Sequence, residues 1–223
     1  MSTYRELINQ VLIRLREDTI ATDWSGAIND SSTITDYQKV IGALVNDSKR
    51  NIESYHDWLV LRETVEITTV SGTRNYNLSA GQEIKVLDVI NQTQGTHLNQ
   101  ISRTHLNAMK YPSDNSGDPV YYAFNGADAS NNLKVDLEPV PNNAHTISFD
   151  INKSQSNLTL AATVMKVPTQ PVILGAWARA ISERGEDGGT QTGIIAEEFK
   201  ESLNQAISID SSNTKFEMDW VVN

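Results

Sequence analysis

The chain of 223 residues contains no cysteine, no long hydrophobic run and no excess of basic residues. The absence of cysteine excludes disulfide bonds, thiolate catalysis and cysteine-ligated zinc. A membrane-spanning helix needs a run of about 18 apolar residues or more, so we expect no membrane partner. The formal net charge of −10 argues against a protein that binds duplex DNA tightly, because such proteins carry a basic surface.

The negative charge is concentrated near the C-terminal end. Between Glu183 and Asp219, nine acidic residues stand against three basic ones, so this segment holds −6 of the net −10. Such a segment is either a solvated face or a surface that repels nucleic acid. The acids that we consider for a repelling surface are Glu186, Asp187, Glu197, Glu198 and Glu201.

Hydrophobic residues recur at helical spacing near both ends of the chain. The spacing predicts helices over residues 3–18 and 36–58. Each predicted start carries a capping box, Thr3 with Glu6 and Thr35 with Gln38. Towards the other end, Pro171 suits the first turn of a helix that begins at residue 169, and a further helix is predicted over 194–207.

Between these helical regions the hydrophobic period changes to two, which predicts strands. The expected strands cover residues 65–68, 74–78, 84–90, 120–124, 133–137 and 146–151, with a short helix over 102–110. Short strands at hairpin spacing favour a compact antiparallel sandwich or a barrel-like domain.

The predicted fold class is α+β. Two N-terminal and two C-terminal helices form one discontinuous antiparallel bundle, and the β domain is inserted between its halves. The expected division is 1–60 for the first half of the bundle, 61–168 for the β domain, 169–210 for the second half and 211–223 for an extended C-terminal arm.

The arm is the most informative part of the sequence. Phe216, Met218, Trp220 and Val222 occupy every second position, which predicts an extended strand with one apolar face. A chain end frays unless it is anchored, so these side chains need a surface on their own subunit or on another. The loop that contains Trp24 is a second candidate contact.

Signals for catalysis are weak. The four histidines show no metal-ligand spacing, and the glycine-rich run 188–193 lacks the Lys-Ser/Thr pair of a phosphate-binding loop. Neighbouring acids such as Glu197 and Glu198 could supply the carboxylates of a glycoside hydrolase, but acids on one helix do not face each other across a cleft. We therefore expect no catalytic residue, metal or cofactor.

Four elements in a fixed order are similar to the head-to-tail adaptors of short-tailed bacteriophages, the tail tubular protein A or tail accessory factor type. These are Tyr4-Arg5-Glu6-Leu7-Ile8 with Leu12-Ile13-Arg14-Leu15; Asn46-Asp47-Ser48-Lys49-Arg50 followed by His56-Asp57-Trp58 and Leu61-Arg62; Arg184-Gly185-Glu186-Asp187-Gly188-Gly189; and Ala196-Glu197-Glu198-Phe199-Lys200 ending near Ile209-Asp210. The resemblance covers the helical ends of the chain and is weak across the predicted strands.

The resemblance implies a structural virion protein of the neck, made in the host cytoplasm, and not an enzyme. Such adaptors form a ring, typically a dodecamer, between the portal and the tail nozzle, and DNA passes through its centre without sequence-specific binding. The acids named above would then line the channel, and the C-terminal arm would dock on the portal or on a neighbour. Two alternatives stay open: a carboxylate-based cell-wall glycan hydrolase, and a different tail-completion or decoration protein.

Overall fold

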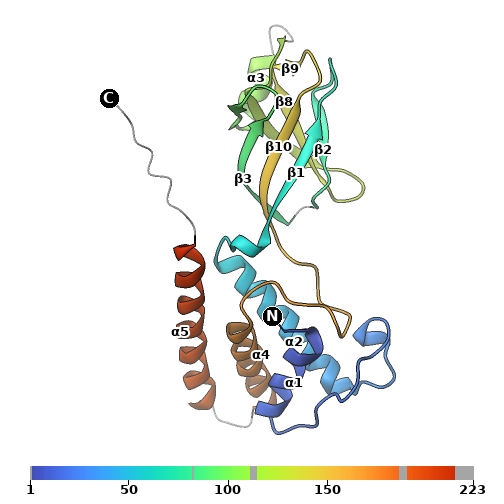
Figure 1. Ribbon diagram of the computed structural model, residues 1–223, viewed down its shortest axis with the longest axis vertical. Coiled ribbons are helices and arrows are strands. Elements are labelled where there is room, and N and C mark those ends of the chain that lie inside the picture. The colour runs from blue at the N-terminus through green and yellow to red at the C-terminus, as the bar shows by residue number, and fades with distance from the viewer. Residues whose placement is uncertain (1, 82, 111–114, 186–189, 214–223) are drawn as a thin grey trace. The chain divides into compact units, whose positions relative to one another are not determined.

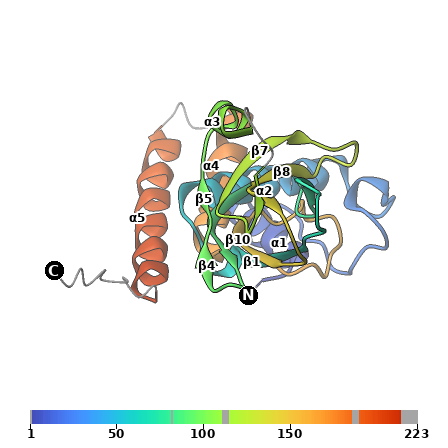
Figure 2. The same ribbon diagram turned by 90° about the horizontal axis from the view of Figure 1, so that it is seen from above.

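The computed structural model describes residues 2–81, 83–110, 115–185 and 190–213, and it has the α+β class predicted from the sequence (Figures 1 and 2). Contacts between Cα atoms divide the chain into two compact units. Unit 1 combines residues from 1–61 with residues from 155–223, and unit 2 is formed by residues 62–154. Residues 155–168, which the sequence division assigns to the β domain, therefore belong to unit 1 by their contacts.

The described part of unit 1 is helical. Its elements are α1 (Tyr4–Arg14), η1 (Ile28–Asp30), α2 (Asp36–Tyr55), η2 (Leu59–Leu61), α4 (Thr169–Arg184) and α5 (Thr190–Ser212). Both predicted capping boxes are present, because the side chains of Thr3 and Thr35 accept from the main-chain amides three residues later. α1 ends at Arg14, before the predicted end at residue 18. Arg16 has a φ of 58°, in the left-handed region, so a right-handed helix cannot continue through it.

One hydrophobic core joins the helices of unit 1. α2 packs on α1 and α4, and α5 packs on α4. The core residues that come from segments far apart in the sequence include Leu7, Ile8, Ile41, Ile52, Leu158, Met165, Val172, Ala176 and Leu203. Because α1, α2, residues 155–168, α4 and α5 all contribute, neither end of the chain completes this core alone.

Unit 2 contains two four-stranded sheets. The first has the order β1 (Arg62–Thr68), β10 (Thr146–Lys153), β3 (Ile84–Asn91) and β4 (Thr96–His97), and all its pairs are antiparallel. The second has the order β2 (Asn75–Leu78), β8 (Leu133–Glu138), β7 (Tyr121–Ala127) and β5 (Asn99–Gln100). Both sheets contribute to one core, in which the rings of Tyr122 and Phe149 meet edge to face at 5.9 Å.

The prediction of purely antiparallel pairing is wrong in two places. β5 pairs with β7 in parallel, and β6 (Ser116–Gly117) pairs with β9 (Val140–Pro141) in parallel. The helix α3 (Arg103–Lys110), at the predicted position, lies between β5 and β7 in the chain, and a crossover of this kind is what parallel neighbours require. The barrel-like alternative is also not found among the described strands, since β1 and β4 end one sheet and β2 and β5 end the other.

α5 is longer than predicted. It begins at Thr190 and ends at Ser212, so Ser211 and Ser212 are helical and do not belong to an extended arm. Figures 1 and 2 show α5 beside α4 at the side of unit 1, with much of its surface turned away from the other helices. None of the helices in the described ranges is long and apolar enough to cross a membrane.

Candidate interaction surfaces

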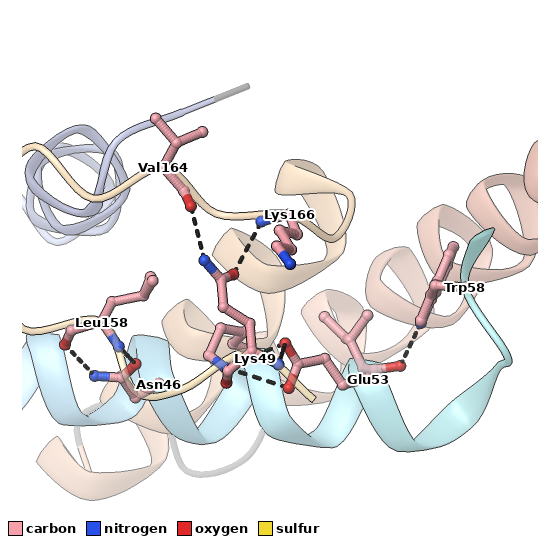
Figure 3. A network of polar contacts seen from close by, with 9 residues as sticks. Asn46, Lys49, Glu53, Trp58, Leu158, Val164 and Lys166 are labelled. Carbon is pink, nitrogen blue, oxygen red and sulfur yellow. Dashed lines mark hydrogen bonds and ion pairs between the residues drawn. The ribbon is translucent and has the colours of Figure 1, made fainter. Parts of the chain in front are cut away.

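Polar side chains of α2 hold residues 155–168, which we call the connecting segment (Figure 3). The Asn46 side chain makes two hydrogen bonds with the main chain of Leu158: Nδ2 donates to the carbonyl oxygen at 3.0 Å, and Oδ1 accepts from the amide at 2.8 Å. Nδ2 also donates to the Tyr4 hydroxyl at 3.1 Å. One amide therefore connects α1, α2 and the connecting segment.

A buried ion pair lies one turn further along α2. Lys49 is 0% exposed, and its Nζ lies 3.1 and 3.2 Å from the two carboxylate oxygens of Glu53. The ammonium group also donates to the main-chain carbonyl of Gln155, and the Gln155 amide donates to Glu53 Oε1 at 3.3 Å (Figure 3). Burial raises the pKa of Glu53, and the neighbouring Lys49 opposes that rise. A buried pair needs such extra hydrogen bonds to offset desolvation, so we assign it a structural role.

The side chain of Gln155 closes the connecting segment on itself. Its Nε2 donates to the carbonyl of Val164 at 2.9 Å, and its Oε1 accepts from the amide of Lys166 at 3.0 Å (Figure 3). Together with the contacts from Asn46 and Lys49, these bonds fix the main chain between unit 2 and α4.

The end of α5 is attached to the end of α2. The Asp210 carboxylate accepts from His56 Nε2 at 3.0 Å and from the Leu59 amide at 3.2 Å. The His56 ring also lies edge to face with Trp58 at 5.0 Å, and the Trp58 indole donates to the Ile52 carbonyl at 2.9 Å. Asp210 therefore positions the last turn of α5, from which the C-terminal residues continue.

The outer face of α5 is acidic. Ile195 and Leu203 are buried on its inner side, whereas Glu197, Glu198 and Glu201 are exposed. Lys200 compensates part of this charge through an ion pair with Glu197 at 2.9 Å. Two isoleucines near the ends of the helix are also open to solvent, Ile194 at 59% and Ile209 at 67% exposure.

The other predicted residues divide into two groups. Trp24 is buried, its indole donates to the Thr159 carbonyl at 3.1 Å, and its ring packs against Tyr4, so its side chain contributes to the core of unit 1. Whether its loop contacts a partner stays a prediction. The remaining residues lie outside the described ranges: Glu186, Asp187, Phe216, Met218, Trp220 and Val222.

The three described acids do not have the geometry of a glycoside hydrolase. Glu197, Glu198 and Glu201 lie within two turns of one exposed helix, whereas hydrolysis requires two carboxyl groups on opposite sides of a bound sugar. In the described part of the chain, no group of three or more acids and histidines is arranged to hold a metal ion.

The buried pair of α2 is not among the residues predicted from the sequence. Lys49 lies four residues after Val45 and three before Ile52, both fully buried, so it falls on the apolar stripe of its helix. A lysine on such a stripe with a glutamate four residues later is the signal that could have identified the pair. The bond from Asn46 to Leu158 has no comparable signal, because its partner is a main-chain group 112 positions away.

Comparison with known families agrees with the resemblance read from the sequence. A family model described as SU10 adaptor protein matches residues 2–218. No curated protein matches the chain. The match extends across the strands of unit 2, where the resemblance from individual motifs is weak.

Proposed function

The chain belongs to the SU10 adaptor protein family, and from this membership we propose that it forms a ring at the neck of a bacteriophage particle, between the portal and the tail nozzle. The family match over residues 2–218 is the observation that carries the proposal. The proposal also includes a closed homo-oligomer, typically of twelve copies, and a central passage for DNA. These details rest on the head-to-tail adaptors that the sequence resembles.

The division of the chain into two units supports the role of a structural subunit in a larger assembly. We propose that the helices of unit 1 form the discontinuous bundle predicted from the sequence and that unit 2 is the inserted β-sandwich. Identical subunits form a ring through heterologous contacts, in which two different faces of one subunit meet in each interface.

The acidic residues suit a channel through which DNA slides. A surface of carboxylates repels the phosphate backbone, so the duplex does not stick to it. Glu197, Glu198 and Glu201 are exposed on one helix, and we propose that they line the channel with Glu186 and Asp187. A ring whose channel is coated by basic residues would contradict this assignment.

We further propose that Phe216, Met218, Trp220 and Val222 dock the end of the chain on the portal or on a neighbouring subunit. Deleting residues 214–223 should then weaken ring assembly or the attachment of the ring to purified portal. Unchanged assembly together with unchanged attachment would reject a docking role for this segment.

Electron microscopy of the purified protein, alone and with portal, tests the adaptor function directly. We expect closed rings of a single symmetry that sit on the portal. A monomer that leaves the portal bare would overturn the proposal, and particles of a different symmetry on the tail would favour a tail-completion or decoration protein.

A further inference from the structure

Among the described strands, β1 forms the longest open edge of the two four-stranded sheets. It has seven residues and pairs on one side with β10, at the end of its sheet. The other edge strands of the two four-stranded sheets, β2, β4 and β5, have four, two and two residues. Natural sheets shorten or block their edges because an open edge recruits another strand, so β1 requires an explanation.

The hydrogen bonds show which residues of β1 point their main-chain groups outwards. The Thr69 amide, just after β1, donates to the His145 carbonyl at 2.8 Å. Thr69 and His145 are therefore a hydrogen-bonded pair, and they follow directly on the pair Thr68 and Thr146 in the register. Hydrogen-bonded and non-bonded pairs alternate along an antiparallel ladder, so Ile67 and Val65 also face β10. The main-chain groups of Arg62, Thr64, Glu66 and Thr68 therefore lie along the open edge.

The side chains at the same four positions are exposed, and two carry opposite charges. Arg62 lies at one end of the edge and Glu66 lies four residues further on. Thr64, between them, donates to Asp150 at 2.7 Å, and Glu66 accepts from Gln92 at 2.9 Å. These hydrogen bonds on the outer face of the sheet position the side chains of Thr64 and Glu66. An added strand that matches this edge needs a negative charge opposite Arg62 and a positive charge opposite Glu66.

Residues 215–219 of this chain have the required pattern. Lys215 and Asp219 are four positions apart with Glu217 between them, and Phe216 and Met218 alternate with these charged residues. In an antiparallel register that places Glu217 opposite Thr64, Lys215 lies opposite Glu66 and Asp219 lies opposite Arg62. Phe216 then lies opposite Val65, whose side chain packs on the core of unit 2.

Charge favours this register over its two neighbours. If Lys215 lies opposite Thr64, Arg62 keeps an acidic partner in Glu217, but Glu66 has no positive partner. A shift by two residues that brings Asp219 opposite Thr64 also brings Glu217 opposite Glu66, and like charges directly opposite destabilise a strand pair. We infer that residues 215–219 of a neighbouring copy of this chain add to β1 as an antiparallel strand with Glu217 opposite Thr64. The inference rests on the proposed ring, in which each copy would lend its C-terminal strand to the next.

A disulfide tests the register cleanly because the natural chain has no cysteine. The double variant Thr64→Cys/Glu217→Cys of the full chain should form disulfide-linked multimers under mild oxidation, seen on a gel without reducing agent and lost on reduction. The control is Thr64→Cys/Asp219→Cys. Its cysteines are separated by two further strand positions, which adds about 6.7 Å along the strand. A disulfide requires Cα atoms no more than about 7 Å apart, so we expect the control to stay unlinked.

A charge exchange supplies a second measurement. Lys215→Glu, added to the first cysteine pair, should slow the formation of linked multimers, and adding Glu66→Lys should restore it. Restoration would not occur if the linkage reflected random collisions between chains.

Each other occupant of the edge gives a distinct result. If the variant stays monomeric and its thiols resist alkylation, the disulfide has formed within one chain. That result would assign the strand to its own chain and overturn the inference. Equal linkage in both cysteine pairs, or linkage in neither, would overturn the register or the docking itself. Microscopy of the same samples separates this failure from that of the proposed function, because rings without linkage reject only the edge contact, whereas the absence of rings rejects the adaptor.

Discussion

His56 and Asp210, which are 154 positions apart in the chain, are joined by a hydrogen bond of 3.0 Å between Nε2 and the carboxylate. The same carboxylate oxygen accepts from the Leu59 amide at 3.2 Å. A single side chain near the end of α5 thus binds both the last turn of α2 and the segment that leads to unit 2.

Removal of this carboxylate should loosen the end of α5. In Asp210→Ala the Leu59 amide loses its acceptor, and a lost hydrogen bond to a charged group costs about 1.5–3 kcal/mol. Hydrogen exchange should accelerate in the last turns of α5 while α4 stays protected. Glu201→Ala, at an exposed position of the same helix, should leave the exchange unchanged. Equal protection in the two variants would show that Asp210 does not fix the helix end.

The buried ion pair of α2 should behave as a unit. Lys49→Met leaves Glu53 buried without its partner, which typically costs about 3–5 kcal/mol of unfolding free energy. The double variant Lys49→Met/Glu53→Leu removes both charges and should recover part of that loss in chemical denaturation. Recovery should be incomplete because the main-chain carbonyl of Gln155 loses its donor, Lys49, and its main-chain amide loses its acceptor, Glu53. Additive losses would show that the two charges are not coupled.

The pKa of Glu53 predicts a pH dependence of stability with a definite sign. Burial raises this pKa above its ordinary value of 4.5, so the folded chain binds the proton more tightly than the unfolded chain. The stability from this group is fully present below pH 4.5 and is lost as the pH rises through the raised folded pKa. The unfolding free energy of the natural chain minus that of Glu53→Gln should therefore fall with rising pH. A difference that rises with pH would contradict the assigned direction.

Gly42 should tolerate no side chain. A Cβ at this position would lie 2.5 Å from the Tyr4 hydroxyl and 3.0 Å from Ile28 Cδ1. Overpacking of this kind costs about 1–3 kcal/mol, more than the roughly 1 kcal/mol by which alanine favours a helix over glycine. Thermal unfolding should show Gly42→Ala to be less stable than the natural chain. Gly193→Ala, where the new Cβ would meet nothing within 4 Å, should instead raise the melting temperature.

Reversal of the charge on α5 should create affinity for DNA. Replacing Glu197, Glu198 and Glu201 by lysine turns a repelling face into an attracting one. The triple variant should retard duplex DNA in a gel at low salt and release it as the salt concentration rises. The matched glutamine variant separates the loss of negative charge from the gain of positive charge. If the natural protein itself retards DNA, a repelling channel is excluded.

Local patterns predicted most of the elements. The capping boxes at Thr3 and Thr35 and the proline at 171 are decided by neighbours in the sequence, and the structure confirms the helix starts that they predict. The alternation that begins at Val65 and the turns after it placed the main strands within a few residues. What local patterns cannot give is pairing: the parallel contact of β5 with β7 depends on the crossover through α3.

The contacts that hold unit 1 together were equally hidden. Lysine and glutamate are rarely buried, so Lys49 and Glu53 are interpreted as surface residues when no partner is known. Their partner is the main chain of Gln155, which belongs to the other side of unit 2 in sequence. The exposure of Glu197, Glu198 and Glu201 was predictable from the amphipathic pattern, because it depends on one helix alone.

The division of unit 1 between two distant parts of the sequence sets an order of events on the ribosome. Residues 62–154 can complete their sheets as soon as they emerge, whereas α1 and α2 must wait for α4 before their core is closed. At synthesis rates of about 5–20 residues per second, the N-terminal helices remain exposed for roughly 5–20 s while unit 2 is translated. Nascent chains therefore display an uncovered apolar helix pair to chaperones, and unit 1 assembles last.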